Sequence, residues 1–453
     1  MLLQGDAARI PLRDGLVQTC VTSPPYWAQR KYKGNDDPGS IGLEPLFDCG
    51  AWKEHFPKWR LRFGKDDKVI KYMERPSAIH SVRLCGECHV CRMIAAGREV
   101  WRVGRDDFVW WLNYGDCFVN EHLAFCAVTV AKALVADGWM ARNDLAWYKR
   151  NPMPESVGGW RWEQRKEKVA ARGKSAAGAD KYENAGAGNP HAARDGYEAE
   201  YEYGEGHVLR RGSWRHTKAH EYIFQLVKAP QYYCNQEAVR ESALRESQER
   251  AARGFKPLLG DEHNAYGDGF LRDGKPHQFR GRNPRSVLDV TTAAYKGAHY
   301  ATFPPDLIAP LIRASCPRRA CPDCGQAWAP VVETRRSIIC GNGKHRAGID
   351  QVSDGSDESG FEQNSKWQTE ISVTGYRSTC ECGRPDHEPG IVLDIFGGSG
   401  TTGMVARQLM RRWIVMDISQ PYLDEQAKVR TGSGTPARAL EGLPMFEGVS
   451  GNT

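Results

Sequence analysis

Residues 22–27 read TSPPYW and come directly after a short apolar run. Proline has no N–H to give to a sheet, so a strand that enters this segment is expected to end at Ser23. The first proline also restricts Ser23 to extended geometry and leaves backbone carbonyls unpaired. Ser23, Pro24, Pro25 and Tyr26 therefore form a stiff segment that presents hydrogen-bond acceptors beside a flat aromatic ring. Such a segment can hold a planar group that carries an amine.

A glycine-rich loop near the other end of the chain gives a second chemical signal. The apolar run GIVLDIF leads into GGSGTTG, and Gly398-x-Gly400-x-x-Gly403 fits the spacing of a dinucleotide-binding loop. Asp417 follows nineteen residues after Gly398, at the end of the next expected strand. A nicotinamide enzyme builds the rest of its sheet after this loop, whereas only fifty residues remain here. Strands that precede the loop must therefore complete the sheet.

The two acids beside this loop suit a different ligand. Glycines let a ligand approach the backbone closely, and an acid after the next strand can accept both hydroxyls of a ribose. S-adenosylmethionine carries such a ribose and no phosphate. Asp417 can accept the ribose hydroxyls, and Asp394 can face the positively charged amino acid end. A tight strand-to-helix turn without a ligand is the alternative.

The chain has 14 cysteines, and several of them have metal-ligand spacing. Reduced thiols or metal ligation suit a cytosolic chain better than disulfides. We expect two closed, structural zinc sites, with buried or chance thiols as the alternative. Neither set follows the H-x-E pair that a zinc deaminase needs. The first set is Cys321, Cys324, Cys380 and Cys382, and the second is Cys85, Cys88 and Cys91, with Cys49 as the fourth ligand.

Length and charge set outer limits on the kind of protein. The chain has 453 residues, enough for a large core, and its formal net charge of +6 is modest for that length. Basic residues dominate 272–285, which suits contact with nucleic-acid phosphates or a solvated basic loop equally well. Nothing resembles a signal peptide, and no apolar run is long enough to span a bilayer. We therefore expect a cytoplasmic protein that makes no membrane contact.

Apolar strand-like runs alternate with helical ones, which indicates an α/β sheet. We expect strands near 109–116 and 144–150 and a core strand with its flanks at 220–235, in addition to those that precede the two chemical motifs. Helices are expected from His122 to Leu134, from Pro305 onward and up to Met410.

TSPPYW and LDIFGGSGTTG, in this order along the chain, together resemble the amino-group DNA methyltransferases of the β arrangement. In that family the catalytic motif precedes the cofactor motif. Four further blocks are similar to the family's blocks in the expected order, and the cysteine-bearing insertions resemble those of phage and prophage members. About half of the chain is covered, by these motifs and by LAWYKRNPMPESV, HEYIFQLVKAPQYY, HYATFPPDLI and RWIVMDISQPYLDEQ.

The resemblance implies a Rossmann-like S-adenosylmethionine-dependent methyltransferase fold with a circularly permuted motif order and zinc-binding-like insertions. It implies core segments at 1–33, which holds the catalytic motif, and at 104–160, 214–235, 286–315 and 390–430, of which the last two carry the cofactor pocket. The expected additions are insertions at 34–103 and 161–213, the latter flexible, a target-recognition region at 236–285, a zinc-ribbon-like insertion at 316–389 and a tail at 431–453.

The resemblance also implies roles for single residues. The exocyclic amine of a flipped base would donate to Ser23 and to the carbonyl of Pro24, while Tyr26 stacks on the base. Acceptors that draw the amine hydrogens out of the ring plane make its nitrogen more nucleophilic. His299 is a weaker cofactor candidate, and Lys149 and Asn151 could hold DNA or the base. The expected cofactor residues are Asp394, Phe396, Gly398, Gly400, Thr401, Asp417, Phe303, Pro304 and Asp6, of which Asp6 could equally form a turn.

Serine as the first residue of the tetrapeptide favours cytosine N4 as the methylated atom, with adenine N6 as the alternative. A catalytically silent, zinc-containing DNA-binding protein is a further alternative from another class. The expected partner is double-stranded DNA, read by 236–285 and with 161–213 as a second candidate. The expected setting is a bacterial or phage-infected cell, with a role in restriction-modification, and both a monomer and a homodimer remain open.

Overall fold

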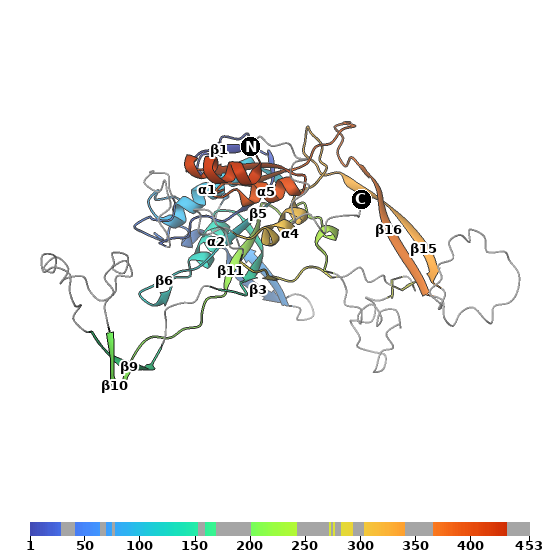
Figure 1. Cartoon of the computed structure of the whole chain (residues 1–453). Coiled ribbons are helices and arrows are strands. Elements are labelled where there is room, and N and C mark those ends of the chain that lie inside the picture. The colour runs from blue at the N-terminus through green and yellow to red at the C-terminus, as the bar shows by residue number, and fades with distance from the viewer. Residues whose placement is uncertain are drawn as a thin grey trace, which may run out of the picture. The chain divides into compact units, whose positions relative to one another are not determined.

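The computed structural model describes residues 1–28, 41–63, 69–74, 78–152, 159–168, 201–241, 271–272, 275–276, 282–292, 303–339 and 366–432 (Figure 1). The chain divides into two compact units. The first consists of Met1–Arg150 and His220–Thr453, and the second is Asn151–Ala219.

An eight-stranded sheet forms the centre of the first unit. Only β11 runs antiparallel to its neighbours in this sheet, so the carboxyl ends of the other strands meet at one edge. This mixed sheet confirms the predicted α/β class. In spatial order the strands are β1 (Leu2–Gln4), β18 (Arg412–Asp417), β17 (Ile391–Asp394), β2 (Val17–Thr22), β5 (Gly104–Tyr114), β11 (His220–Val227), β8 (Met140–Tyr148) and β14 (Val287–Asp289).

Helices cover both faces of this sheet because the central strands are apolar on both sides. On β5, Trp110 and Leu112 face one core, while Val109 and Trp111 face the other. The helices in the first core are α1 (His89–Val103) and α2 (Cys126–Ala136), and those in the second are α4 (Pro305–Ser315) and α5 (Thr401–Gln408).

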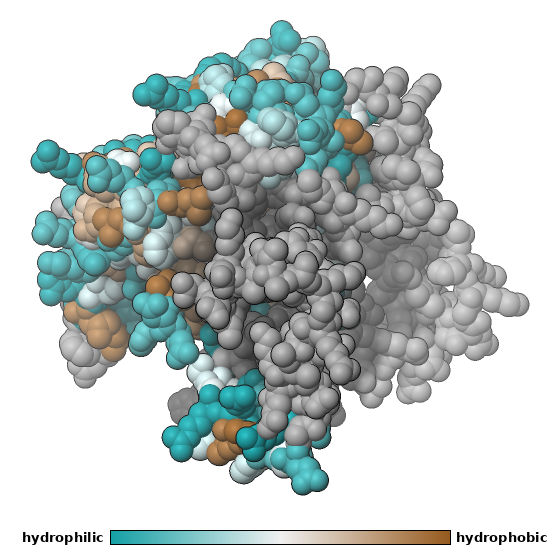
Figure 2. Space-filling view, turned by 60° about the vertical axis from the view of Figure 1, so that its left-hand side comes forward, coloured by the Kyte–Doolittle hydropathy of each residue, from teal (hydrophilic) through white to brown (hydrophobic). Residues whose placement is uncertain are grey.

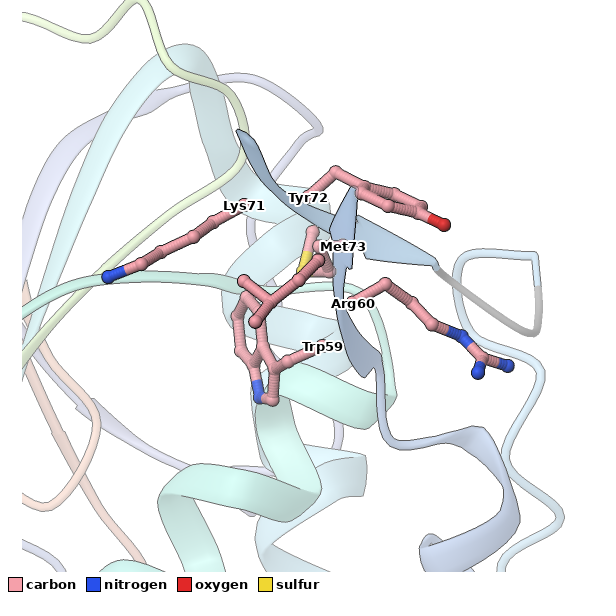
Figure 3. A pocket seen from close by; sticks show the side chains of 6 residues that line it. Trp59, Arg60, Lys71, Tyr72 and Met73 are labelled. Atoms are coloured by element: carbon pink, nitrogen blue, oxygen red, sulfur yellow. The ribbon is translucent and has the colours of Figure 1, made fainter. Parts of the chain in front are cut away.

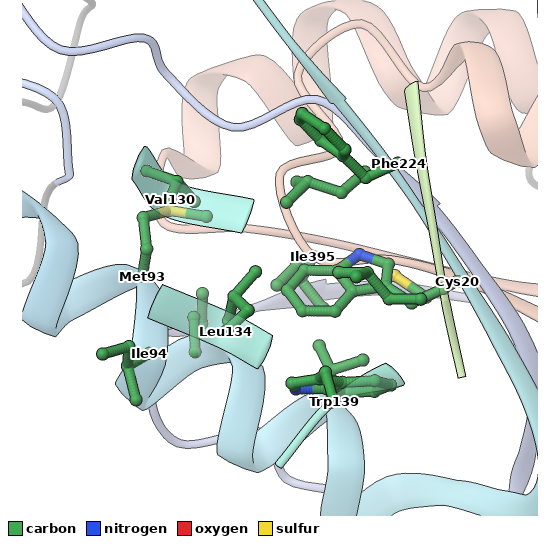
Figure 4. Close-up of a cluster of buried hydrophobic side chains, with 14 of the residues drawn as sticks. Cys20, Met93, Ile94, Val130, Leu134, Trp139, Phe224 and Ile395 are labelled. Atoms are coloured by element: carbon green, nitrogen blue, oxygen red, sulfur yellow. The ribbon is translucent and has the colours of Figure 1, made fainter. Parts of the chain in front are cut away.

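Figure 4 shows part of the first core, where Met93 of α1 and Leu134 of α2 lie with Cys20 of β2. The two helices approach closely at Gly97, because a Cβ there would lie 2.7 Å from Leu134 Cδ2. A larger residue at Gly97 would therefore push α1 away from α2.

Two local predictions are confirmed and one is wrong. The strand that enters the proline segment ends at Thr22, and α4 begins at Pro305, where the fixed φ of proline suits the first helical turn. The helix expected from His122 begins only at Cys126, because residues 118–123 turn back as the short pair β6 (Phe118–Val119) and β7 (His122–Leu123).

The predicted insertion at 34–103 is wrong over its last part. Helix α1 lies inside this range, yet Val90, Met93, Ile94 and Val100 are fully buried in the core. Their three- and four-residue spacing is that of an amphipathic helix, whose signal the neighbouring cysteines and charges obscured.

The flexible insertion predicted at 161–213 contains regular structure where the structure describes it. There β9 (Arg161–Lys168) pairs with β10 (Tyr201–Arg210) as an antiparallel hairpin, and 169–200 lie outside the described residues. Most of the expected target-recognition region, 236–285, and nearly all of the tail also lie outside them.

The remaining described elements are hairpins and short turns. In the part of the chain that the structure covers, no helix combines the length and hydropathy of a membrane span. The hairpins are β3 (Lys58–Phe63) with β4 (Val69–Glu74), β12 (Leu271–Arg272) with β13 (Lys275–Pro276), and β15 (Ala329–Ile339) with β16 (Lys366–Arg377), and the turns are η1 (Lys53–His55), η5 (Glu237–Val239), α6 (Gln420–Tyr422), the π-helical turn η7 (Leu423–Ala427) and α7 (Lys428–Thr431).

Candidate active site

The carboxyl edge of the sheet gathers the residues that the sequence singled out. Ser23 follows β2, Asp394 ends β17 and Asp417 ends β18. The loop after β1 joins them, because the Gly5 N–H donates to the Asp417 carbonyl oxygen at 3.0 Å. Parallel strands of an open sheet place ligand sites at this edge.

The proline segment is held tightly on one side. The Tyr26 ring stacks on Tyr114, with ring centroids 4.9 Å apart and 29° between the planes. A Cβ at position 115 would lie 2.6 Å from Tyr26 Cε2, so Gly115 allows the close approach. Gly42 packs similarly against Pro25, where its φ of +116° also favours glycine. Tyr114 covers one face of the Tyr26 ring, so a base would stack on the opposite face.

A polar cluster surrounds the hydroxyl groups of Ser23 and Tyr26. Tyr26 donates to Glu221 Oε2 at 2.8 Å, and Ser23 Oγ lies 3.2 Å from the Tyr26 hydroxyl. Asn113 Nδ2 lies 2.8 Å from that hydroxyl, 3.0 Å from Glu221 Oε2 and 3.3 Å from Ser23 Oγ. Lys149 pairs with the other carboxylate oxygen of Glu221. Burial and the neighbouring Glu221 raise the pKa of Tyr26 well above its ordinary value, so its hydroxyl stays protonated.

Behind Tyr114 lies a second, fully buried network. His89 Nδ1 lies 2.9 Å from Glu44 Oε2, and His89 Nε2 lies 2.6 Å from the Tyr114 hydroxyl. Burial acts to raise the pKa of Glu44, but the contacts with His89 and two backbone hydrogen bonds together outweigh it and lower that pKa. Trp27 joins the same network through its indole N–H, which donates to the Glu44 carbonyl oxygen at 2.9 Å.

The glycine loop connects β17 to α5 with two residues in the left-handed region. Gly398 has φ 46° and Gly400 has φ 75°, conformations that glycine adopts without strain. Asp417 fixes the loop, because Oδ2 accepts from the Gly398 N–H and Oδ1 accepts from the Ser419 N–H, both at 2.8 Å. The Ser419 hydroxyl is buried and has no hydrogen-bond partner among the described residues. This orphaned hydroxyl and the half-buried carboxylate beside it fit the polar part of a nucleoside.

Asp394 links the glycine loop to the proline segment. Its Oδ1 accepts from Thr22 Oγ1 and its Oδ2 from Thr402 Oγ1, each at 2.6 Å. Burial raises its pKa to about 6 despite these hydrogen bonds. A positively charged ligand group beside this carboxyl would favour its ionised form.

The other expected cofactor residues differ in how the structure uses them. Phe396 is half-buried on the loop, whereas the Thr401 hydroxyl is buried and accepts from Arg430 at 2.7 Å. Phe303 is buried in the core beneath α4, and Pro304 forms the N-cap of that helix. Asp6 makes a turn, in which its Oδ1 accepts from the Ala8 N–H at 2.8 Å. His299 lies outside the described residues.

The structure brings each predicted set of four cysteines together. The ligand atoms of Cys49, Cys85, Cys88 and Cys91 all lie within 4.8 Å of one another, and so do those of Cys321, Cys324, Cys380 and Cys382. Four thiolates at this spacing fit a tetrahedral zinc ion with Zn–S bonds of about 2.3 Å.

Backbone N–H groups support the sulfur atoms in the first cluster. Cys88 N–H donates to Cys85 Sγ at 3.3 Å, and Cys91 N–H donates to Cys88 Sγ at 3.4 Å. In the second cluster, the hydroxyl of Ser378 and the N–H of Cys382 lower the pKa of Cys380 to about 6. These contacts favour the thiolate forms of Cys85 and Cys380, whereas burial raises the pKa of Cys88 to about 11 and the hydrogen bond with Cys324 raises the pKa of Cys382 to about 12.

Comparison with known proteins assigns the family. The family model described as DNA methylase, of the N6/N4 type, matches residues 17–321 and 378–428. The chain belongs to this DNA methylase family. The methylase therefore has the methyltransferase fold in the order predicted, with the proline segment before the glycine loop.

Curated relatives of the methylase include type II methyltransferases. The methylase is 26% identical over 345 residues to M.Cfr9I of Citrobacter freundii, covering 69% of this chain and 72% of the relative. It is 30% identical over 167 residues to M.SfiI of Streptomyces fimbriatus, covering 33% of this chain and 29% of the relative. Among solved structures it is similar to the PvuII DNA methyltransferase (cytosine-N4-specific), with 12% identity, a TM-score of 0.42 and coverage of 97% and 89% of the two chains.

The sequence analysis of the methylase missed Asn113, Glu221, Glu44 and His89. Each is a polar residue inside or beside an apolar segment, and His89 lies between two predicted metal ligands. A polar residue in an otherwise buried strand is a signal that could have found Asn113. Nothing in the spacing could have paired Glu221 with Tyr26, which lies 195 residues earlier.

Proposed function

We propose that this DNA methyltransferase transfers a methyl group from S-adenosylmethionine to the exocyclic amine of a base flipped out of duplex DNA, with cytosine N4 favoured. The observation that carries the proposal is the 2.6 Å hydrogen bond from Thr22 to Asp394. It joins the residue that precedes Ser23 to the acid at the start of the glycine loop. An amine at Ser23 and a ligand at the loop would therefore be neighbours.

Each group has a distinct task in this reaction. The cofactor supplies an electrophilic methyl group, Asp417 accepts its ribose hydroxyls and Asp394 faces its amino group. Ser23 Oγ and the Pro24 carbonyl accept from the base amine and orient its lone pair. Tyr26 would stack on the base with the ring face opposite Tyr114, which offsets part of the stacking that the base loses on leaving the duplex.

Cytosine N4 is favoured because Ser23 supplies a neutral hydroxyl where adenine N6 enzymes usually have aspartate or asparagine. Adenine N6 is the alternative target atom. A silent DNA-binding protein is disfavoured, because Ser23, Tyr26, Asp394 and Asp417 lie along one sheet edge.

Product analysis tests the target atom. Purified protein is incubated with unmethylated DNA and S-adenosylmethionine, and the digested nucleosides are identified by mass spectrometry. We expect N4-methylcytosine. N6-methyladenine would overturn the base assignment, and no methylated nucleoside in DNA of varied sequence would favour the silent binding protein.

Zinc fills both four-cysteine clusters in this proposal, as a structural ion. The first cluster fixes the start of α1, because Cys88 is its N-cap and Cys91 lies in its first turn. The second joins the two ends of the β15–β16 hairpin, because Cys321 and Cys324 precede it and Cys380 and Cys382 follow it.

Hairpin β3–β4 is a candidate DNA contact outside the expected recognition region. Trp59 is 68% exposed and Leu61 is 62% exposed, and Figure 3 shows Lys71 on the same side of the hairpin as Trp59. A hollow of about 420 Å³ lies between the side chains of Trp59, Arg60, Leu61, Lys71, Tyr72 and Met73. A basic two-stranded ribbon with exposed aromatic rings suits the major groove of duplex DNA.

Hairpin β9–β10 in the second unit and the residues beside it also combine exposed aromatic rings with basic side chains, as hairpin β3–β4 does. Trp162 is 68% exposed and Trp160 is 66% exposed, with the Arg211 guanidinium 5.1 Å from the Trp160 ring centroid. Hydrophilic residues cover most of the described surface in Figure 2, and hydrophobic residues form separate patches on it. Exposed tryptophans beside arginines support a role for 161–213 in contacting DNA.

The biological setting proposed is restriction-modification. The relatives M.Cfr9I and M.SfiI are named type II methyltransferases. A methyl group on a base amine at the recognition site would protect that site from a partner nuclease.

A further inference from the structure

We propose that Glu221 is a positioning residue that strengthens Ser23 as a hydrogen-bond acceptor through Tyr26, and that it takes up the proton that the target amine must lose. This inference rests on the proposed function. Neither Glu221 nor Asn113 belongs to the proline segment or the glycine loop, so their place in the site comes from the geometry alone.

The sheet places these groups in one row. Asn113 of β5 and Glu221 of β11 point to the same face, because their strand neighbours Trp111 and Ile223 share one core. Ser23 continues the same face from the end of β2, and Lys149 continues it from the end of β8. Four neighbouring strands thus bring a hydroxyl, an amide, a carboxylate and an ammonium group to one edge.

The carboxylate fixes the direction of every hydrogen bond in the row. An ionised Glu221 only accepts, so the Tyr26 hydroxyl must donate to it at 2.8 Å. The Tyr26 oxygen is then free to accept the Ser23 hydrogen, and Asn113 must turn Nδ2 toward Glu221. Ser23 therefore directs its hydrogen away from the base and its oxygen lone pair toward the amine.

A chain of this kind strengthens its first acceptor. Each hydrogen bond polarises the next, so a carboxylate two bonds away makes Ser23 Oγ a better acceptor than an isolated hydroxyl. The ion pair with Lys149 holds Glu221 in place at the end of the chain. Ser23 thereby gains part of the acceptor strength that a carboxylate would have at its position.

The same chain gives the leaving proton a route. Once methylated, the amine nitrogen carries one proton more than the neutral product. One N–H bond breaks as Ser23 takes this proton and passes its own to Tyr26, and Tyr26 passes its proton to Glu221. The net change is one N–H bond lost and one O–H bond formed on the Glu221 carboxylate, which later releases the proton to water.

Asn113 holds the three hydrogen-bonded side chains of Ser23, Tyr26 and Glu221 in position. It is 5% exposed, and its Nδ2 contacts all three oxygen atoms of the chain. Its Oδ1 is buried without a hydrogen-bond partner among the described residues. An unpaired buried acceptor beside Ser23 suits an arriving amine that has hydrogens to donate.

The test measures the turnover number for label transfer from methyl-labelled S-adenosylmethionine to unmethylated genomic DNA. Glu221→Gln keeps the shape of the side chain but removes its charge and its capacity to take up a proton. We expect kcat to fall about 100-fold, with cofactor and DNA dissociation constants within twofold of wild type. Glu99→Gln is the matched control, because Glu99 is a carboxylate paired with Arg102 outside the site. It should keep the wild-type rate.

A double variant at Tyr26 and Glu221 shows whether the two residues act through one hydrogen-bond chain or affect the rate independently. Tyr26→Phe removes the linking hydroxyl and keeps the ring, so it should also slow transfer without weakening DNA binding. Because Glu221 acts through Tyr26, Tyr26→Phe combined with Glu221→Gln should be no more than about twofold slower than the slower single variant.

If the rate losses of the two single variants multiply in the double variant, or if Glu221→Gln keeps the wild-type kcat, the hydrogen-bond chain from Ser23 to Glu221 is contradicted. The proposed function would remain intact in both cases. No transfer by the wild-type enzyme would overturn the proposed function and the chain together. If Glu221→Gln does not fold, Tyr26→Phe decides alone: a slow enzyme with normal DNA affinity supports the chain, and a wild-type rate contradicts it.

Discussion

At the scale of single residues, three acidic side chains at the ends of sheet strands have different hydrogen-bond partners. Asp394 is wholly buried and holds two threonines, whereas Asp417 is half-buried and holds two backbone N–H groups. Glu221 instead accepts from a tyrosine. Burial and partners, rather than residue type, therefore separate a positioning acid from one that can meet a ligand.

Asp417→Ala should weaken S-adenosylmethionine binding about 10- to 100-fold, because it removes an acceptor for two ribose hydroxyls and releases the Gly398 N–H. Isothermal titration of cofactor into the free enzyme measures this. Asp14→Ala is the control, since Asp14 is exposed and precedes β2 at the opposite edge of the sheet. Equal affinity in Asp417→Ala and wild type would contradict the ribose assignment.

Cofactor affinity should rise between pH 5 and pH 7. The pKa of Asp394 is about 6 in the folded protein, so the carboxyl is mostly protonated at pH 5 and mostly ionised at pH 7. A cofactor ammonium group favours the ionised form, which predicts binding about tenfold tighter at pH 7 than at pH 5. Asp394→Asn should lose this pH dependence. Titrations at both pH values check it, and an equally steep dependence in the variant would contradict the assignment.

The raised pKa of Asp394 has the opposite effect on the stability of the ligand-free protein, which should fall as the pH rises. Because it lies above the ordinary value of 3.8, the protonated carboxyl stabilises the fold, fully below pH 3.8 and progressively less as the pH rises through 6. The shift corresponds to about 3 kcal/mol between these limits. Urea unfolding of the wild type and Asp394→Asn at pH 4 and pH 7 would measure the difference.

At the scale of elements, α1 connects the first four-cysteine cluster to the proline segment. Cys88 caps the helix, and His89 in the first turn bonds to Tyr114, on which Tyr26 stacks. The first cluster therefore supports the position of Tyr26 from behind.

Purified enzyme should contain two zinc ions per chain, and Cys88→Ser should contain one. The variant should melt at least about 5 °C lower, because the start of α1 loses its anchor, and should methylate DNA more slowly. Elemental analysis and thermal unfolding measure both effects. Cys234→Ser, at an exposed cysteine outside the clusters, is the control. Wild-type enzyme without zinc would contradict the metal assignment.

Hairpin β3–β4 should contribute to DNA affinity through charge and stacking. Arg62→Gln and Lys71→Gln should each reduce the slope of log K against log salt by about 0.9, as expected for one lost phosphate contact. Trp59→Ala should weaken binding with little change in this slope. Fluorescence anisotropy with duplex DNA at several salt concentrations measures these effects, with Arg13→Gln as a control at an exposed position before β2. Unchanged affinity in all three variants would exclude the hairpin from the interface.

Prediction from sequence succeeded where the signal is local. Proline chemistry gave the end of β2, glycine spacing gave the loop after β17, and cysteine spacing gave both clusters. Prediction failed where the contacting residues are far apart in the sequence. Glu221 reaches Tyr26 because β11 inserts antiparallel between β5 and β8, which no local pattern encodes. Helix α1 was missed because its apolar stripe lies beside cysteines and charged residues.

At the scale of the whole molecule, the proline segment and the glycine loop come from opposite parts of the chain. Thr22 and Asp394 are 372 residues apart in sequence and hydrogen-bonded in the fold. The neighbouring strands β2 and β17 bring them together, and the intervening sequence supplies the two cysteine clusters and the hairpins. The central claim is that this junction is where the methyl group is transferred.

The most direct test compares wild type with Tyr26→Ala in label transfer from methyl-labelled S-adenosylmethionine to duplex DNA, with cofactor affinity measured in both. Wild type should label DNA, and Tyr26→Ala should lose at least about 100-fold in rate while binding the cofactor within twofold of wild type, because it removes the platform for the base and the hydroxyl that links Ser23 to Glu221 but leaves Asp394 and Asp417 in place. Equal label transfer by the two proteins, or none by wild type, would contradict the account.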